Sequence, residues 1–298
     1  MRTLKTSEAA AVLNVSPNTL RAWERRFGYP KPQRSPGRHR LYVHAEIAAL
    51  RDALMEGLSI SSAISRAREA VAADTHALVG ALGAFELDRA DQAMEGTIAL
   101  KSVEHAIDEV LLPSMEQLAE RHGTDSAPWS LMARWAVDWL GRVRRLSPAP
   151  SRSQWLVIGD ASGAELSPEG IKVRALEVAV GRVGLPSVTL PVHGIAGLAD
   201  VLASVDPHAV VIAGAGVADD DVARWAYRVR MAIGPLPVLL FGRGAREGAT
   251  RATGARRLPD SPVRAADAVL EILNELGAPQ ERVRPPQVMA SRSGKRSA

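Results

Sequence analysis

The sequence predicts a multidomain chain with an α-helical N-terminal domain, a four-helix bundle, and a C-terminal α/β domain with a doubly wound parallel sheet. The first part alternates short helices with a basic segment, and the middle carries only helical periodicity. The last part repeats short apolar runs, each followed by a helical pattern. We expect the first domain at residues 1–74, the bundle at 75–146, a Pro- and Ser-rich linker at 147–154, the sheet domain at 155–277 and a basic disordered tail at 278–298.

The N-terminal domain is expected to begin with two short helices separated by a turn. Thr6 suits the cap of the first helix, Glu8 suits its first turn, and Asn14 suits its end. Ser16 is a good helix cap and Pro17 is preset for the first helical position. A second helix should therefore start directly after the turn.

The second helix has two faces with different chemistry. Leu20, Trp23 and Phe27 recur at three- and four-residue spacing and can pack inward. Polar residues on another face remain free to touch a ligand, namely Asn18, Arg21 and Arg25. Residues 31–42 follow with prolines, a glycine and the run Arg38-His39-Arg40, which favours a short hairpin. The pattern predicts a helix-turn-helix with a basic wing, which suits DNA.

The charge of the chain is concentrated in this domain. Residues 1–46 hold nine Lys and Arg against three acids, a net charge of +6, whereas the whole chain carries +4. The remainder is therefore slightly acidic. A solvated basic surface is the alternative explanation, but the charge coincides with the helix-turn-helix pattern, which favours a polyanion as partner.

Composition excludes several classes of protein. The 298 residues contain no cysteine, which excludes disulfide frameworks, thiolate metal sites and cysteine nucleophiles. Glu8 and Asn14 interrupt the region where a signal peptide needs an apolar core, and no later run is long enough for a membrane helix. We expect a cytoplasmic protein.

The middle domain shows apolar residues at helical spacing. Trp135, Trp139 and Val143 recur every four residues, with Trp129 and Met132 a turn or two earlier. These side chains either fill a core or line a pocket for a flat ligand. The expected helical segments are residues 75–85, 88–101, 103–122 and 127–146.

The C-terminal domain alternates strands with helices. Continuously apolar runs indicate strands that are buried on both faces of a parallel sheet. The runs are 156–158, 188–190, 210–212 and 238–241. Ligands of such sheets bind at the carboxyl ends of the strands. The segments that follow the strands there are 159–170, 191–194, 214–217 and 242–244.

Signals for catalysis are weak. Residues 159–163 come closest to a dinucleotide-binding glycine pattern but do not complete it, and no Walker lysine or nucleophile elbow is present. The acids Asp219, Asp220 and Asp221 are best explained by the favourable field at the start of a helix. Five of the seven histidines show no metal-ligand spacing with one another, namely His39, His44, His76, His105 and His208. We expect neither an enzyme nor a metal site.

Three segments resemble the MerR family of winged-helix transcription regulators: residues 6–13, Asn18 to Gly28, and Gly37 to Tyr42. The resemblance implies a dimer that binds an inverted repeat in promoter DNA, with the second helix in the major groove and the wing on the backbone or minor groove. It implies a set of DNA-binding residues, namely Asn18, Thr19, Arg21, Arg25, Arg34, Arg38, His39, Arg40 and Tyr42.

The order of the three domains resembles the cobalamin-binding CarH and LitR branch of that family. In this branch a corrinoid lies between bundle and sheet, and a histidine in an ExHxxG motif ligates it. The matching segment is residues 165–170, where Ser167 occupies the histidine position. His122 stands where a tryptophan is expected, and Met132-Ala133 replace a Glu-His pair. Because a serine hydroxyl is a poor donor to cobalt, His-ligated cobalamin is not expected.

Another histidine near the predicted interface of bundle and sheet, His122 or His193, could contact a bound ligand instead. The candidate pocket residues are His122, Trp129, Met132, Trp135, Ser167 and His193. The expected function is a sequence-specific regulator whose C-terminal module controls oligomerisation or responds to a small molecule or protein partner. The alternatives are a cobalamin-dependent light-responsive repressor with unusual ligation, and a corrinoid enzyme component with an accessory domain.

Overall fold

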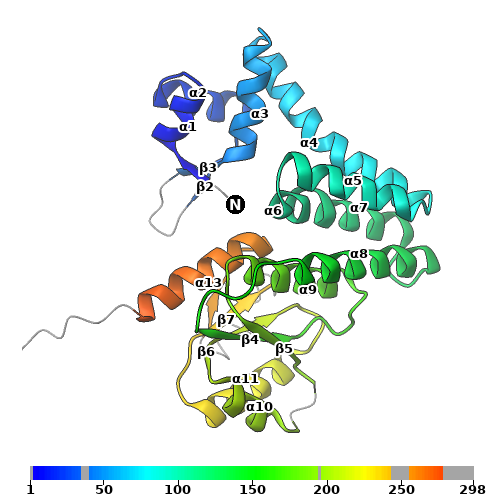
Figure 1. Ribbon diagram of the computed structural model, residues 1–298, viewed down its shortest axis with the longest axis vertical. Coiled ribbons are helices and arrows are strands. Elements are labelled where there is room, and N and C mark those ends of the chain that lie inside the picture. Colours follow the sequence, from blue (N-terminus) through cyan, green and yellow to red (C-terminus); the bar gives the residue numbers. More distant parts are fainter. Residues whose placement is uncertain (1–2, 35–39, 194–195, 243–254, 278–298) are drawn as a thin grey trace, which may run out of the picture.

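The computed structural model describes residues 3–34, 40–193, 196–242 and 255–277. An N-terminal domain sits at one end of the molecule, a helical bundle lies beside it, and a sheet covered by helices forms the other end (Figure 1). The expected tail at 278–298 lies outside the described residues. Helix-period patterns, apolar runs and cap residues therefore predicted the fold class correctly.

The N-terminal domain combines a small antiparallel sheet with helices. Its strands pair in the order β1-β3-β2, so the wing is the expected hairpin. The elements are β1 (Thr3–Lys5), α1 (Thr6–Val12), α2 (Pro17–Phe27), β2 (Gln33–Arg34), β3 (Arg40–Val43) and α3 (His44–Met55). Their apolar faces enclose one core around the fully buried side chains of Leu20, Ile47 and Leu50.

Local signals set the helix ends in this domain. Ser16 caps α2, its Oγ accepting the Thr19 amide at 3.0 Å, and Gly28 ends it at a φ of +63°. Asn14 turns the chain between the helices at a φ of +54°. The expected Thr6 cap was wrong by one residue, because Lys5 holds the extended cap position. Glu8 still satisfies that end, accepting the Lys5 amide at 2.7 Å.

The bundle is continuous with the N-terminal domain. Helix α4 (Ile60–Gly83) runs from one into the other, so the expected boundary at 74 and 75 falls inside a single helix. The other elements are α5 (Leu87–Leu100), α6 (Val103–His105), the π-helical η1 (Ala106–Leu111), α7 (Leu112–His122) and α8 (Ala127–Arg145). None of the helices in the described part of the chain is long and apolar enough to cross a membrane.

The C-terminal domain is a five-stranded parallel sheet in the order β5-β4-β6-β7-β8. Helices α9 and α13 pack on one face and α10 and α11 on the other. The elements are β4 (Trp155–Asp160), α9 (Pro168–Arg182), β5 (Ser187–Pro191), α10 (Leu198–Val205), β6 (Pro207–Ala213), α11 (Asp219–Ile233), β7 (Val238–Phe241), β8 (Arg256–Arg257) and α13 (Pro262–Gly277). The sequence did not predict β8, because its two exposed arginines give no apolar signal.

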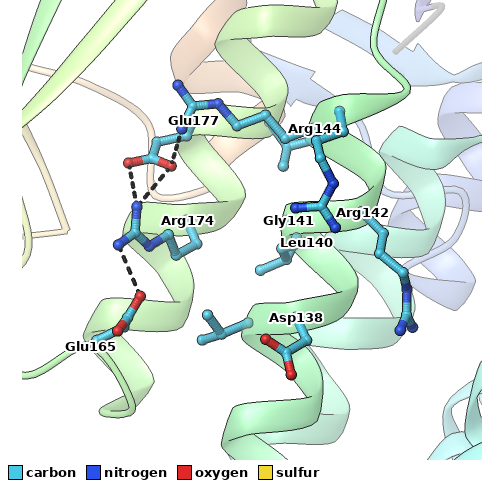
Figure 2. Close-up of a pocket in the computed structure, with 11 residues that line it drawn as sticks. Asp138, Leu140, Gly141, Arg142, Arg144, Glu165, Arg174 and Glu177 are labelled. Carbon is cyan, nitrogen blue, oxygen red and sulfur yellow. Dashed lines mark hydrogen bonds and ion pairs between the residues drawn. The ribbon is translucent and has the colours of Figure 1, made fainter.

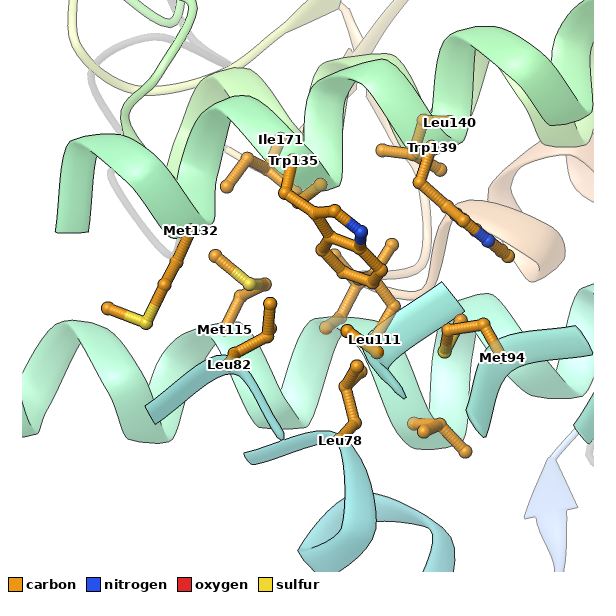
Figure 3. Close-up of a cluster of buried hydrophobic side chains, with 14 of the residues drawn as sticks. Leu78, Leu82, Met94, Leu111, Met115, Met132, Trp135, Trp139, Leu140 and Ile171 are labelled. Carbon is orange, nitrogen blue, oxygen red and sulfur yellow. The ribbon is translucent and has the colours of Figure 1, made fainter. Parts of the chain in front are cut away.

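Bundle and sheet domain share one hydrophobic core. Ile171, Ala175 and Val178 of α9 pack into the cluster formed by the bundle helices, and Figure 3 shows Ile171 beside Trp135. Helix α9 therefore serves both domains, since its other side covers the parallel sheet. Burial of this apolar surface holds the two domains against each other.

Candidate nucleic-acid interface and ligand site

The outer face of α2 is polar and open to solvent. Asn18, Arg21 and Arg25 are exposed, whereas Leu20 on the opposite face is fully buried. Trp23 and Phe27 pack against the domain core. The core therefore fixes the helix from behind and leaves the polar side chains available. A helix held in this way can present guanidinium and amide groups to base edges in a major groove.

Thr19 and Arg26 are engaged within the domain. The Thr19 hydroxyl lies 2.8 Å from the Ser16 hydroxyl, as part of the α2 cap. The Arg26 guanidinium stacks over the Phe27 ring, 5.2 Å from its centroid. Arg21 and Arg25 make no ion pair with the residues that the structure describes. They are the better candidates for contacts with DNA.

The wing is tied to α2 through Glu24. Arg40 of β3 donates from Nε to Glu24 at 3.1 Å, and the Tyr42 hydroxyl donates to the same carboxylate at 3.3 Å. The Tyr42 side chain is fully buried, and burial raises the pKa of its hydroxyl. The expectation that Tyr42 contacts DNA was therefore wrong, because its hydroxyl fixes the angle between wing and helix.

The remaining wing residues are placed only in part. Arg34 lies in β2, and its side chain is outside what the structure describes. Arg38 and His39 also lie outside the described residues. Phosphate contacts by these three residues remain a prediction.

The aromatic candidates of the ligand pocket are core residues. Trp129, Met132 and Trp135 are at most 5% exposed and belong to the core shared by bundle and α9. Trp135 Nε1 donates to Asp91 at 2.9 Å, which ties the ring of this α8 residue to α5. Of the two interpretations left open by the sequence, burial favours the core.

Ser167 caps α9. Its Oγ accepts the Gly170 amide at 3.0 Å and donates to the Ala164 carbonyl at 2.7 Å. Gly170 has no room for a side chain, since a Cβ there would lie 2.3 Å from the Glu165 carbonyl oxygen. The motif that would hold a lower cobalamin ligand is therefore a tightly wound helix start.

Bundle and sheet domain are in direct contact at this motif. Trp129 Nε1 donates to the Leu166 carbonyl at 2.9 Å, and Ile171 is fully buried behind it. His122, at the end of α7, is half-buried with Nε2 unbonded to any described residue, and His193 is exposed after β5. The residues present do not fit a corrinoid bound through this motif.

A different cavity lies between the C-terminal half of α8 and α9. Its volume is about 770 Å³, and charged side chains surround it (Figure 2). Four of them form a ladder in which Arg144 donates to Glu177 at 2.9 Å, Arg174 donates to Glu177 at 3.0 Å, and Arg174 donates to Glu165 at 2.9 Å. Sequence reasoning missed this site; the one signal was a glutamate within the buried stretch of α9.

A smaller cavity of about 270 Å³ lies where the sheet domain meets the bundle. Asp108 of η1 accepts a hydrogen bond from Ser261, which precedes α13, and burial raises the pKa of Asp108 to about 6. Glu46 of the N-terminal domain interacts with Glu109 of the same π-helix, and its pKa rises to about 7, mainly through burial. Acidic groups of the N-terminal domain and of the bundle therefore influence each other here, and the sheet domain adds a hydrogen bond to the bundle.

Comparison with known proteins agrees with this architecture. The model of the MerR family regulatory protein matches residues 5–42. The HTH-type transcriptional repressor CarA of Myxococcus xanthus is 29% identical over 262 residues, covering 82% of this chain and 88% of CarA. CarH of the same organism, also an HTH-type transcriptional repressor, is 27% identical over 169 residues, covering 49% of this chain and 56% of CarH.

A third relative is similar over a shorter stretch. The HTH-type transcriptional regulator MlrA of Escherichia coli is 49% identical over 45 residues, which are 15% of this chain and 18% of MlrA. The similarity to MlrA is thus short, whereas the similarity to CarA covers most of both chains. Residues 5–42 therefore form a MerR-type DNA-binding domain, and the chain is related over most of its length to the transcriptional repressor CarA.

Proposed function

We propose that the protein is a repressor that binds promoter DNA as a dimer or higher oligomer, with α2 in the major groove. The observation that carries the proposal is the exposed face of Asn18, Arg21 and Arg25 on α2. The buried Leu20 and the contacts of Glu24 with the wing hold this helix in place. Repression is proposed because CarA and CarH are named as repressors.

The assignment of roles follows from the two kinds of contact. Arg21 and Arg25 would read base edges, since guanidinium groups recognise guanine through paired hydrogen bonds. Asn18 and Thr19 lie at the N-terminal end of α2, where this kind of helix meets the bases or adjoining phosphates. Arg34, Arg38 and His39 of the wing would contact phosphates, which give affinity without sequence preference.

The fused bundle and sheet domain would control how copies of the chain assemble. Its core is continuous and its cobalamin motif is closed, so we propose an effector other than His-ligated cobalamin. The effector would be a small molecule or a protein, and its binding would change the spacing or number of DNA-binding domains. The proposed domain limits are those expected from the sequence, with the first boundary inside α4.

A mobility-shift assay on the DNA upstream of its own coding region tests the proposal. We expect a shift that survives excess competitor DNA at physiological salt. Arg21→Ala should lower the preference for the specific site by about tenfold, equivalent to one good base contact. Arg89→Ala is the matched control, because Arg89 is an exposed arginine of α5 outside the N-terminal domain. Equal binding to specific and competitor DNA would reject the proposal.

A further inference from the structure

The cavity between α8 and α9 has the features of a site for a small amphipathic molecule. Its volume of about 770 Å³ lies within the range of drug-sized binding sites. Val137, Leu140 and Val178 supply an apolar floor, and charged side chains surround it (Figure 2). An apolar surface with a few fixed charges can hold the body of a ligand and orient its ionised group.

Arginines are the most numerous charged residues in the cavity lining. Its lining contains four arginines, Arg142, Arg144, Arg145 and Arg174, and three acids, Asp138, Glu165 and Glu177. The ladder uses few of the guanidinium donors, since Arg144 donates to Glu177 from Nη1 alone. A guanidinium carries five N–H donors, so further donors remain for an anion in the cavity.

Arg145 is the arginine whose charge is not compensated. It is exposed and makes no ion pair with any residue in the described ranges, whereas Arg142 pairs with Asp91 at 2.6 Å. Its guanidinium lies close to Gly141, because a Cβ on Gly141 would meet Nη1 of Arg145 at 3.6 Å, an ordinary contact distance. The uncompensated guanidinium thus lies over the glycine in the cavity lining.

The helix dipole explains only part of this charge. Arg142, Arg144 and Arg145 occupy the last turn of α8, where cations are favoured. That preference does not account for Arg174, which comes from α9, or for the apolar hollow between the helices. Nor does the ladder need Arg145, because Glu177 already has two arginine partners.

We propose that this cavity binds an aromatic organic anion, whose ring covers the apolar floor and whose carboxylate or similar group pairs with Arg145. The proposal rests on the proposed function, in which the bundle and sheet domain respond to an effector. A ligand that contacts both α8 and α9 stabilises their association, because it binds the closed arrangement and not the separated one. The anion would therefore strengthen the closed form of the module.

Isothermal titration of the full-length chain with 2-naphthoate tests the proposal, with 2-naphthamide as the uncharged ligand of the same shape. We expect saturable binding of the naphthoate and affinity about tenfold lower for the amide, because a charge-assisted hydrogen bond is lost. Equal affinities would show an apolar site without anion selectivity and would overturn the proposal. Absence of naphthoate binding up to millimolar concentration would also overturn it.

Variants locate the site. Arg145→Gln should weaken naphthoate binding about tenfold, and Asp138→Asn should strengthen it about twofold by removing a like charge. Arg134→Gln is the control, since Arg134 is an exposed arginine of the same helix that does not line the cavity. If Arg145→Gln and Arg134→Gln bind naphthoate equally well, the site is wrong.

A parallel mobility-shift assay separates this inference from the proposed function. Arg145→Gln should leave DNA binding without naphthoate unchanged, because Arg145 lies in the bundle and not on α2. Naphthoate binding without specific DNA binding would remove the proposed regulator but keep the anion site. Specific DNA binding without naphthoate binding would do the reverse.

Discussion

Arg144 of α8 donates a hydrogen bond of 2.9 Å to Glu177 of α9, whose side chain is only 2% exposed. The carboxylate is charged and nearly buried, and it joins the bundle to the sheet domain. Arg174 donates to it from the same helix as Glu177. Breaking a buried ion pair by removing one partner is costly, because it leaves an uncompensated charge. Glu177 is protected against this by having two partners.

The two arginines should therefore substitute for each other. We expect Arg144→Met to lower the free energy of unfolding by about 1 kcal/mol, and the double variant with Arg174→Met to lower it by about 3 kcal/mol. Urea unfolding of the full chain measures both. Arg142→Met is the control, since Arg142 lies on the same helix and pairs with Asp91 of α5 instead of with Glu177. A loss in the double variant that equals the sum of the losses in the two single variants would contradict the idea that both arginines share the Glu177 carboxylate.

Ser167 has a structural role that can be measured. Ser167→Ala should cost about 1 kcal/mol of stability, since the α9 amide at Gly170 loses its cap. Thermal unfolding of the variant and of Ser130→Ala checks this, because the exposed Ser130 hydroxyl donates to the Ser126 carbonyl and accepts no helix amide. An unchanged midpoint for Ser167→Ala would show that the cap bond contributes nothing.

Restoring histidine at this position should not restore a cobalamin site. We expect Ser167→His, mixed with adenosylcobalamin in the dark and desalted, to show no corrinoid absorption in the protein fraction. The reason is that Trp129 donates a hydrogen bond to the Leu166 carbonyl and belongs with the fully buried Ile171 to one packed core. Retained cobalamin in this variant would show that bundle and sheet separate enough to admit the ligand. Retention by the unaltered protein would support unusual ligation instead.

Glu46 predicts a dependence of stability on pH. Burial, then the charge of Glu109, raises its pKa from 4.5 to about 7, opposed by Lys31 and Arg264. The unfolded chain therefore releases this proton at lower pH than the folded one. The contribution of Glu46 to the free energy of unfolding is therefore fully present below about pH 4.5 and is lost as the pH rises through 7.

Glu46→Gln should remove most of this loss. Between pH 5 and pH 8 we expect the free energy of unfolding of the unaltered protein to fall by about 2 kcal/mol more than that of the variant, after allowance for partial exposure. Asp52→Asn is the control, because Asp52 is exposed in the same helix. Asp108, whose pKa rises to about 6, contributes in the same direction and remains in both proteins. Parallel pH profiles of the three proteins would contradict the assignment.

The hydrogen bonds of Arg40 and Tyr42 to Glu24 predict how changes in the wing affect DNA binding. Arg40→Ala and Tyr42→Phe should each weaken DNA binding about threefold by loosening the wing, an effect equivalent to a weak hydrogen bond. The dependence of affinity on salt should stay unchanged, because neither side chain need contact a phosphate. Anisotropy titrations at several salt concentrations measure this, and Glu24→Gln combined with Arg40→Ala should be no worse than either alone. A shallower salt slope for Arg40→Ala would assign Arg40 to the DNA.

Much of the fold and part of the interface could be predicted from neighbouring residues. Ser16-Pro17 starts α2, and Gly28 ends it. Asn14 turns the chain after α1, and the continuous apolar runs form strands of the parallel sheet. These features depend on hydrogen bonds and apolar spacing within a few residues, so the sequence contains them directly. The exposed face of Asn18, Arg21 and Arg25 follows from the same periodicity.

The tertiary structure alone decided which polar and aromatic groups are used inside. Tyr42 and Arg40 meet Glu24 from 18 and 16 residues away, and Arg144 meets Glu177 from 33 residues away. Trp129 fills a core because its indole reaches Leu166, 37 residues along the chain. Burial and pairing depend on which distant segments pack together, and that information is not present in local periodicity.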